Sequence, residues 1–249
     1  MKALVTGASS GIGRDIAREL AAEGWEIIAV ARRTDRLHEL KDDFGDLITC
    51  VRCDVSHPEE CKKLHEVMQE EDIDLLVNCA GFGLCGFFDE TDMDTELEMI
   101  HTNIVAVHIL TKLFLQDFIA KDSGYILNVA SIAGFFSGPL MATYYATKNY
   151  VVSLTCAIRE ELKQQGSNVQ ISAFCPGPVD TEFNDVANVK FSTTPISSKK
   201  AAKKALHGVM KGKAVVVPSL KIKSLKFFKR LLPDTFITQM CYHFQKKKQ

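Results

Sequence analysis

Short apolar runs alternate with longer amphipathic segments over the first 218 residues of the chain. The runs are rich in Val, Ile and Leu and too short for helices, so they predict strands that are buried on both faces. The segments between them repeat apolar residues at helical spacing, as helices that cover a sheet do. This alternation predicts one doubly wound α/β domain with a parallel sheet. The predicted strands are 2–6, 26–31, 47–53, 73–77, 124–130, 169–174 and 214–217. The first predicted helix ends near residue 23, and the others span about 58–70, 94–121, 144–165 and 198–211.

The last segment, residues 219–249, departs from this alternation and extends the predicted domain of residues 1–218. Apolar and basic residues are interleaved in it, and their spacing predicts an amphipathic helix with a basic face over 220–232. A second apolar stretch, 236–244, follows. Two interpretations of this segment stay open. In the first, its apolar face docks on the domain or on an oligomer interface, over the mouth of a substrate site. In the second, the segment attaches reversibly to an anionic membrane.

Composition bounds the class of protein and its compartment. The chain has 249 residues, 46% of them hydrophobic, and a net charge of −1, but residues 199–249 hold 14 of the 30 Lys and Arg residues. The eight cysteines lie mostly in apolar runs, and the single C-x-x-C pair falls in a predicted strand, which favours reduced thiols in a cytoplasmic protein. The seven histidines do not recur at metal-ligand spacing, and the basic segment lacks the features of a nucleic-acid-binding surface. We therefore expect neither a metal nor a nucleic-acid partner.

A glycine-rich turn joins the first predicted strand to the first predicted helix. It is Gly7-Ala8-Ser9-Ser10-Gly11-Ile12-Gly13. Glycines let the backbone turn tightly and approach a pyrophosphate, and the helix N-terminus supplies N–H donors and a positive dipole end. In this setting the turn predicts a dinucleotide-binding domain of the Rossmann type.

Two arginines, Arg32 and Arg33, follow the second predicted strand directly. An acid at this point accepts hydrogen bonds from the ribose 2′-hydroxyl of NAD, whereas arginine suits the 2′-phosphate of NADP. NADP(H) is therefore the expected cofactor. Asp35 comes later than the usual ribose-binding acid, and it keeps NAD(H) as the alternative.

A serine, a tyrosine and a lysine form the candidate catalytic group. Tyr144 and Lys148 are one turn apart on the same face of the predicted helix. A free tyrosine has a pKa of about 10, and a neighbouring ammonium lowers this pKa, which makes the hydroxyl usable for proton transfer. Ser131, at the end of a predicted strand, can hold the oxygen of a carbonyl or an alcohol. Tyr145 is the rival to Tyr144, but it has no lysine four residues later, so we expect it to point elsewhere.

Together these motifs resemble the short-chain dehydrogenase/reductase superfamily, in its NADP-preferring branch, over residues 1–218. The resemblance implies a catalytic triad of Ser131, Tyr144 and Lys148, in which Asn103 holds a water that connects Lys148 to solvent. It also implies a series of cofactor contacts, made by side chains and backbone along the carboxyl ends of the strands. These contacts are Gly7, Ser9, Ser10, Gly11, Ile12 and Gly13 in the turn, Arg32 and Arg33, Asp54 and Val55 near the adenine, Asn78 (partly as a structural brace), Ala80 and Gly81, Tyr144 and Lys148, and Pro176, Gly177, Val179 and Thr181 at the nicotinamide end.

Apolar residues flank the candidate catalytic group and predict an apolar substrate pocket. Phe135 and Phe136 are expected to bind the substrate together with Ser131 and Tyr144. The loop after Pro176, as far as about residue 194, is expected to close over it. The flanking residues are Phe82, Leu84, Phe87, Phe88, Phe135, Phe136, Leu140 and Met141.

The expected function is the NADPH-dependent interconversion of a ketone or aldehyde and an alcohol, with Tyr144 as general acid and base. The expected substrate is apolar: a steroid, an acyl-chain ketone or an aromatic carbonyl. One alternative is a 3-oxoacyl thioester reductase of lipid synthesis, and another is a non-catalytic dinucleotide-sensing or scaffold protein. The predicted helices 94–121 and 144–165 resemble those that pair in the family's dimers and tetramers, so a homo-oligomer is expected. Peripheral membrane contact through 219–249 is the alternative to a purely cytoplasmic location.

Overall fold

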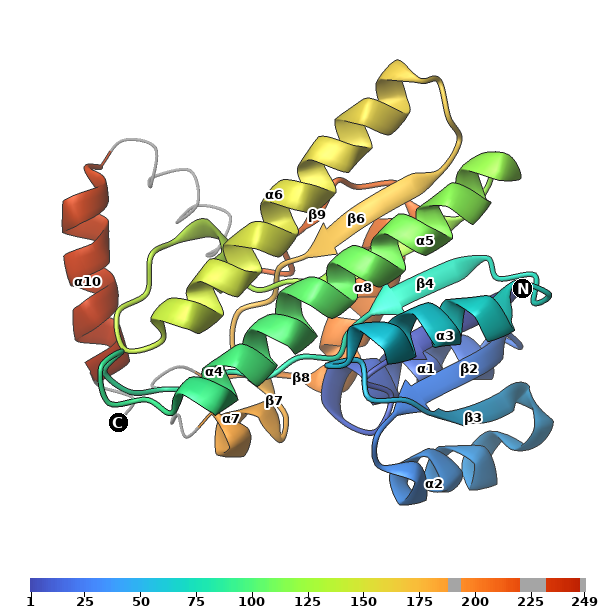
Figure 1. Ribbon diagram of the computed structural model, residues 1–249, viewed down its shortest axis with the longest axis horizontal. Helices are drawn as coiled ribbons and strands as arrows, with labels where there is room; N and C mark the ends of the chain where they lie inside the picture. The colour runs from blue at the N-terminus through green and yellow to red at the C-terminus, as the bar shows by residue number, and fades with distance from the viewer. Residues whose placement is uncertain (188–193, 220–231, 247–249) are drawn as a thin grey trace.

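A sheet of seven parallel strands forms the centre of the computed structural model, which describes residues 1–187, 194–219 and 232–246. The strand order is β3-β2-β1-β4-β5-β6-β9, so the chain winds outward in both directions from β1 (Figure 1). This order confirms the predicted doubly wound α/β fold. Ligands of such sheets bind beyond the carboxyl ends of the strands, where the strand order reverses. The strands are β1 (Lys2–Thr6), β2 (Glu26–Ala31), β3 (Ile48–Arg52), β4 (Leu75–Asn78), β5 (Tyr125–Val129), β6 (Gln170–Phe174) and β9 (Val215–Val216).

The strands are buried on both faces of the sheet. In β1, Ala3 and Val5 pack into the apolar cluster on one face and Leu4 into the cluster on the other, and none of the three has exposed surface. Burial on both sides explains why the apolar runs in the sequence are continuous rather than alternating. The predicted strands differ from the observed ones by about two residues or fewer at each end, the usual uncertainty of element boundaries.

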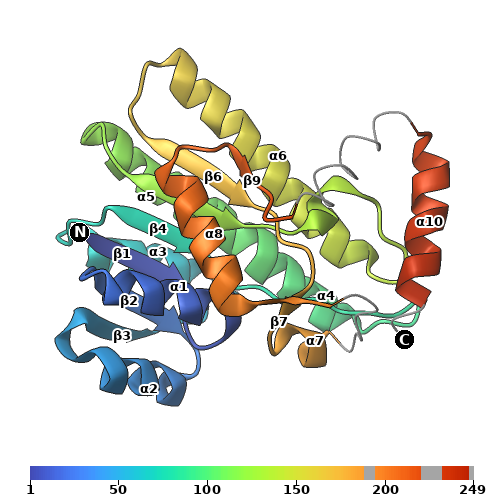
Figure 2. The ribbon, with the colours of Figure 1, turned by 180° about the vertical axis from the view of Figure 1, so that it is seen from behind.

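Helices cover both faces, as Figures 1 and 2 show from opposite sides. The sequence analysis did not predict one of them, α2. Its residues are mostly charged and only Leu37 and Leu40 are buried, so its apolar stripe is too narrow to stand out. One face carries α1 (Gly11–Ala22), α2 (Thr34–Phe44) and α8 (Ser198–Met210); the other carries α3 (Pro58–Met68), α5 (Val107–Ala120) and α6 (Ala142–Gln164).

The predicted helix 94–121 contains a π-helical segment, His101–Ala106, between α4 (Met93–Ile100) and α5. π-Helical turns hold an extra residue and are frequent at functional sites. Asn103 lies in this segment and is fully buried. The whole stretch is long and apolar enough to cross a bilayer by length and composition, but α5 packs against β4, β5 and α3, which makes it a core helix of this fold.

Short elements follow β6 and lie at the carboxyl edge of the sheet. Two parallel strands, β7 (Val179–Asp180) and β8 (Ile196–Ser197), pair with each other, and α7 (Phe183–Val186) lies beside them (Figure 2). Turns of 3-10 helix lie at Gly45–Leu47 and Ile132–Phe135.

The C-terminal helix α10 (Asp234–Lys246) stands beyond the same edge, apart from the helices that cover the sheet (Figures 1 and 2). Ile237 anchors it and packs in an apolar cluster with Phe135 and Phe136. The second apolar stretch, 236–244, thus lies in a helix that docks on the domain, in line with the first of the two interpretations. The predicted helix 220–232 lies outside the described residues, except for Leu232.

Candidate active site

A cavity of about 610 Å³ lies at the carboxyl edge of the sheet, within the described part of the chain. The glycine turn and the ends of β2 and β3 line one end of it, and α6, α7 and α10 line the other. Ser131, Tyr144 and Lys148 lie where the two ends meet. All the catalytic and cofactor-binding residues expected from the sequence line this cavity except Asn78 and Asn103.

The glycine turn packs against the end of β4 so closely that side chains do not fit. Gly7 has a φ of +69°, and a Cβ on it would lie 2.8 Å from the backbone nitrogen of Ala80. A Cβ on Gly13 would lie 2.4 Å from the carbonyl oxygen of Gly7. Ser10, the N-cap of α1, makes no capping hydrogen bond with its side chain. The first turn of α1 therefore presents backbone N–H groups and a positive helix end to the cavity, and these can hold a pyrophosphate.

Thr6 fixes the glycine turn to the neighbouring strand. Its Oγ1 donates to the carbonyl of Val77 at 3.3 Å and accepts from the backbone nitrogen of Cys79 at 3.0 Å. The sequence analysis did not assign Thr6 a role. The sequence feature that could have identified Thr6 is its hydroxyl at the last position of a mainly apolar predicted strand, directly before the glycine turn.

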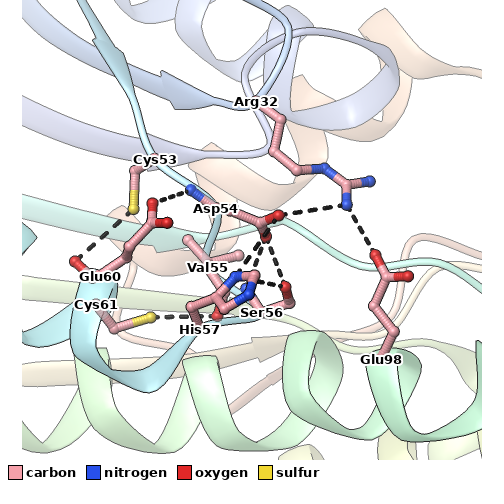
Figure 3. Close-up of polar contacts among 9 residues, drawn as sticks. All are labelled: Arg32, Cys53, Asp54, Val55, Ser56, His57, Glu60, Cys61 and Glu98. Carbon is pink, nitrogen blue, oxygen red and sulfur yellow. Dashed lines mark hydrogen bonds and ion pairs between the residues drawn. The ribbon is translucent and has the colours of Figure 1, made fainter. Parts of the chain in front are cut away.

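Arg32 reaches from the end of β2 to two carboxylates (Figure 3). Its Nη1 lies 2.7 Å from Oε1 of Glu98 and 3.6 Å from Oδ2 of Asp54. Burial acts to raise the pKa of Asp54, but hydrogen bonds from Ser56 and the charge of Arg32 outweigh it, so this pKa is lowered. An ionised Asp54 beside the buried Val55 offers an acceptor and an apolar wall, a combination that suits an adenine ring.

Arg33, the second arginine after β2, contacts the segment after β7 and the glycine turn. Its Nη1 lies 2.9 Å from Oε2 of Glu182, in the segment after β7, and its Nη2 donates to Oγ of Ser9 at 3.2 Å. Arg33 and Glu182 are about half exposed, and ion pairs this exposed contribute little. A phosphate can therefore displace Glu182 and take a bidentate bond from the guanidinium.

The candidate catalytic residues come from the end of β5 and the start of α6. Oγ of Ser131 caps the following 3-10 turn by accepting from the backbone nitrogen of Ala133 at 3.1 Å. Nζ of Lys148 donates to the carbonyl of Val129 at 3.0 Å and lies 5.9 Å from the centroid of the Tyr144 ring. Lys148 is thus anchored to β5 with its ammonium close to the tyrosine.

Burial governs the ionisation of both Tyr144 and Lys148. It raises the pKa of Tyr144 to about 12, with the Ser131 hydroxyl acting in the opposite direction. It lowers the pKa of Lys148 to about 8. The expected lowering of the Tyr144 pKa by the ammonium is not found: burial raises this pKa, and the one opposing contribution comes from the Ser131 hydroxyl. Tyr144 is protonated at neutral pH and suited to begin a reaction as a general acid.

Asn103 is a buried brace that does not line the cavity. Its Oδ1 accepts from the backbone nitrogen of Phe82 at 3.2 Å, and its Nδ2 donates to the carbonyl of Phe82 and to Oγ1 of Thr147. These bonds hold the loop after β4 against α6. A Cβ on Gly81 would lie 2.7 Å from Oδ1 of Asn103 and 3.4 Å from Nζ of Lys148, so the two side chains approach the same glycine. The expected role of Asn103 in holding a water stays a prediction.

Asn78 is also a brace. Its Nδ2 donates to Oδ1 of Asn128 at 2.9 Å and to Oγ1 of Thr111 at 3.1 Å, in the interior between β4, β5 and α5. It does not line the cavity, so only the bracing part of its expected role fits this position.

Phe135 and Phe136, expected to bind the substrate, lie in the core instead. Each is only 8% exposed, packs in the cluster that contains Ile237, and is absent from the cavity lining. The 3-10 turn after Ser131 directs both rings inward, and Asn149 holds this turn against α6 by donating to the carbonyl of Phe136 at 2.8 Å. The expectation for these two residues is therefore corrected.

Other apolar residues line the substrate end of the cavity. Phe82 and Met141 lie there as expected, whereas Phe87 and Phe88 are exposed. Tyr145, expected to point elsewhere, lines the cavity and accepts a hydrogen bond at its hydroxyl from Nε2 of Gln245, 2.7 Å away. Sequence reasoning missed Gln245, because no local pattern links residues a hundred positions apart. The residues that line this end are Phe82, Met141, Tyr145, Phe183, Val186 and Gln245.

Known proteins resemble this chain in sequence and in architecture. A sequence model of the short chain dehydrogenases matches residues 1–190. An uncharacterized oxidoreductase of Staphylococcus saprophyticus is 35% identical over 185 residues, which cover 73% of this chain and 75% of that protein. A short-chain dehydrogenase from Sphingobium yanoikuyae in complex with NADPH superposes with a TM-score of 0.82 at 26% identity, over 92% of this chain and 93% of the other. A short chain dehydrogenase/reductase from Burkholderia phymatum in complex with NAD has a TM-score of 0.84 at 24% identity over 92% of each chain, a likeness of fold.

The fold of this chain agrees with these matches. The chain belongs to the short-chain dehydrogenase family. It is an NAD(P)-dependent oxidoreductase, a dehydrogenase or reductase.

Proposed function

We propose that this oxidoreductase interconverts a ketone or an aldehyde and an alcohol on an apolar substrate, with NADPH as its cofactor. The observation that carries the proposal is the position of Tyr144. It lies between the dinucleotide end and the apolar end of one cavity, with Ser131 at one side and Lys148 one turn along α6. The cavity volume, about 610 Å³, lies in the range of small-molecule sites.

In the direction of reduction, the hydroxyl of Tyr144 gives its proton to the carbonyl oxygen of the substrate. The hydroxyl of Ser131 donates a hydrogen bond to the same oxygen and holds it in place. Lys148 stabilises the phenolate that remains, because its ammonium lies near the ring. The raised pKa of Tyr144 keeps its hydroxyl protonated at neutral pH, the form that donates the proton in reduction.

The dinucleotide fits the residues at the other end of the cavity. The bare backbone of the glycine turn can take the pyrophosphate, and the end of β3 can take the adenine. When bound, NADPH supplies the hydride that the carbonyl carbon accepts. Arg32 and Arg33 support the choice of NADPH, because two guanidinium groups reach this end of the cavity from the first positions after β2. NAD(H) is the alternative, favoured by the carboxylates that already pair with both arginines.

The aromatic lining supports an apolar substrate: Tyr144 packs against Phe183 with ring centroids 5.3 Å apart, and Phe82 and Met141 lie nearby. The same lining can take an acyl chain, so a 3-oxoacyl thioester is the rival substrate. The third reading, a non-catalytic dinucleotide sensor, is disfavoured by the complete Ser131–Tyr144–Lys148 group.

The direct test is turnover of a panel of apolar ketones, aldehydes, alcohols and a 3-oxoacyl thioester by the purified protein, with NADPH and NADH in parallel. Absorbance of the reduced nicotinamide reports the rate. We expect an apolar ketone or aldehyde to oxidise NADPH faster than NADH. Faster turnover of the thioester than of every simple carbonyl would favour the rival, and no turnover of any compound would support the non-catalytic reading.

The proposal includes reversible attachment to anionic membranes through exposed residues of the C-terminal segment. Leu232, Phe236 and Phe244 are each more than 40% exposed on the docked helix and its approach, and Lys246 follows them. Apolar side chains and lysines on one face bind anionic lipid surfaces. Sedimentation with anionic and neutral vesicles at low and high salt tests this part. Binding only to anionic vesicles at low salt is expected, and no binding there leaves docking as the sole role of α10.

A further inference from the structure

The end of α10 places a buried glutamine at the substrate end of the cavity. Gln245 is 1% exposed, although Phe244 beside it is 56% exposed. Its Nε2 donates to the hydroxyl of Tyr145 at 2.7 Å and lies 3.6 Å from Sδ of Met141. Gln245, Tyr145 and Met141 all line the cavity.

One half of this amide has no partner. Oε1 of Gln245 is buried and accepts no hydrogen bond from any residue that the structure describes. Oδ1 of Asn184, another cavity-lining residue, is in the same condition among the described residues. Buried polar groups are nearly always hydrogen-bonded, because an unpaired one loses its water without compensation. Among the described residues a third such oxygen, Oδ1 of Asn78, lies in the core, whereas the other two belong to residues that line one cavity, and Gln245 lies at its apolar end. We take the two on the cavity lining to point to a ligand that carries donors.

The position of Gln245 separates it from the reacting groups. It bonds to Tyr145, whose ring lies 6.2 Å from the Tyr144 ring in an edge-to-face arrangement. Ser131, Tyr144 and Lys148 make no hydrogen bond with it among the described contacts. A group that donates to Gln245 is therefore a different part of the substrate from the carbonyl that Tyr144 protonates.

We propose that Gln245 determines substrate specificity and that the substrate is an apolar ketone with a second, non-reacting hydroxyl group. This hydroxyl donates to Oε1 of Gln245, and Tyr145 holds the amide through Nε2, which leaves Oε1 without a partner among the described residues. The inference rests on the proposed function and narrows its substrate class to hydroxylated apolar carbonyl compounds. It also gives α10 a task in substrate recognition beyond covering the pocket.

The test compares decalone, a bicyclic apolar ketone, with the isomeric hydroxydecalones as substrates of the full-length protein with NADPH. A hydroxyl that bonds to a buried neutral acceptor should raise kcat/KM for the matching isomer about three- to tenfold over decalone. The effect should appear mainly in KM, because the contact is the same in the ground state and the transition state. Gln245→Met keeps the length of the side chain and removes both polar groups, so this preference should fall to about one.

Gln239→Met is the matched control. Gln239 is exposed on the same helix, and its substitution should keep the preference of the wild type. Wild-type turnover of decalone without preference for any hydroxydecalone would overturn the inference and leave the proposed function standing, as would a preference that survives in Gln245→Met. If neither compound is turned over, the panel of carbonyl compounds described above still tests the proposed function separately. Calorimetric binding of the hydroxydecalones to wild type and Gln245→Met then decides the inference: equal affinities overturn it, and weaker binding by the variant supports a hydroxyl contact.

Discussion

The two ends of the cavity are built from different kinds of structure. The dinucleotide end consists of strand ends and one tight turn, in which Gly7 and Gly13 leave no room for a Cβ. The substrate end consists of loops and of α10, and its polar contact joins Tyr145 to a residue one hundred positions away. The first end is fixed by backbone geometry, whereas the second is fixed by how distant segments pack. A change at the first should alter cofactor binding, and a change at the second should alter the choice of substrate.

The candidate catalytic residues lie where the two ends meet, and the largest expected effect comes from changing one of them. Tyr144→Phe keeps the ring and removes only the proton donor, and it should lower kcat about 100- to 10,000-fold while cofactor binding persists. Steady-state kinetics together with cofactor titration measure the two effects separately. Tyr145→Phe is the matched control: it should keep most of the activity, because its hydroxyl bonds to Gln245 and not to the reacting groups. The reverse result would mean that Tyr145 is the proton donor.

The next effect is confined to the dinucleotide end. If Arg32 and Arg33 bind the 2′-phosphate, replacing both by Gln should weaken NADPH binding at least about tenfold more than NADH binding, because hydrogen bonds to charged groups contribute about 1.5–3 kcal/mol each. Titration of each variant with both reduced cofactors measures this ratio. Equal affinity of the wild type for NADPH and NADH would exclude the role of the two arginines.

Glu182→Gln provides the opposite change at the same place. It removes the carboxylate that pairs with Arg33 at 2.9 Å, so NADPH should bind more tightly. The gain should be small, about fivefold or less, because the pair is half exposed.

A third change tests whether the close backbone approach itself matters. Gly13→Ala places a methyl group 2.4 Å from the carbonyl oxygen of Gly7, so the turn must open. We expect cofactor affinity to fall by at least about tenfold, which corresponds to about 1.4 kcal/mol. Gly24→Ala is the control: Gly24 has a φ of +83° and nothing within 4 Å, so alanine there should lower stability and keep the cofactor affinity. Unchanged cofactor binding by Gly13→Ala would show that the turn does not hold the dinucleotide.

These two ends also differ in how well the sequence predicts them. Gly7 and Gly13 stand where the backbone leaves no room for a Cβ, so this requirement is visible in the sequence as glycine. The strand before them is visible as a mainly apolar run. The doubly wound parallel sheet and the glycine turn could therefore be predicted, and the structure brings the predicted Ser131, Tyr144 and Lys148 to one cavity. The helix α2 could not, because its apolar stripe rests on Leu37 and Leu40 alone.

At the substrate end, adjacency in sequence was misleading. Phe135 and Phe136 follow Ser131 closely, but a 3-10 turn points them into the core, and no pattern of apolar residues distinguishes a core ring from a pocket ring. Gln245 could not be found because its role depends on where α10 docks. Asn103 could be singled out, but its bonds to Phe82 and Thr147 depend on the π-helical segment, which the sequence pattern reads as ordinary helix.

A further expected effect concerns pH. The pKa of Lys148 is lowered from 10.5 to about 8, so its ammonium is lost as the pH rises through this value. The pKa of Tyr144 is about 12, so Tyr144 stays protonated over the same range. Because a neutral lysine no longer stabilises the phenolate, kcat/KM for reduction should be level below pH 8 and fall by up to about tenfold per pH unit above it. Lys148→Arg, which keeps its charge, should lower the rate but remove this fall. A level profile in the wild type through pH 10.5 would contradict the role of Lys148.

The central claim is that one cavity brings a dinucleotide to a carbonyl compound whose oxygen Tyr144 protonates. The most direct measurement uses reduced NADPH that carries deuterium at its transferable position, with an apolar ketone as substrate and mass spectrometry of the alcohol. The wild type should place deuterium on the carbinol carbon, and Tyr144→Phe should form the same labelled alcohol about 100- to 10,000-fold more slowly. An alcohol without deuterium, or equal rates of labelling by the two proteins, would contradict the account.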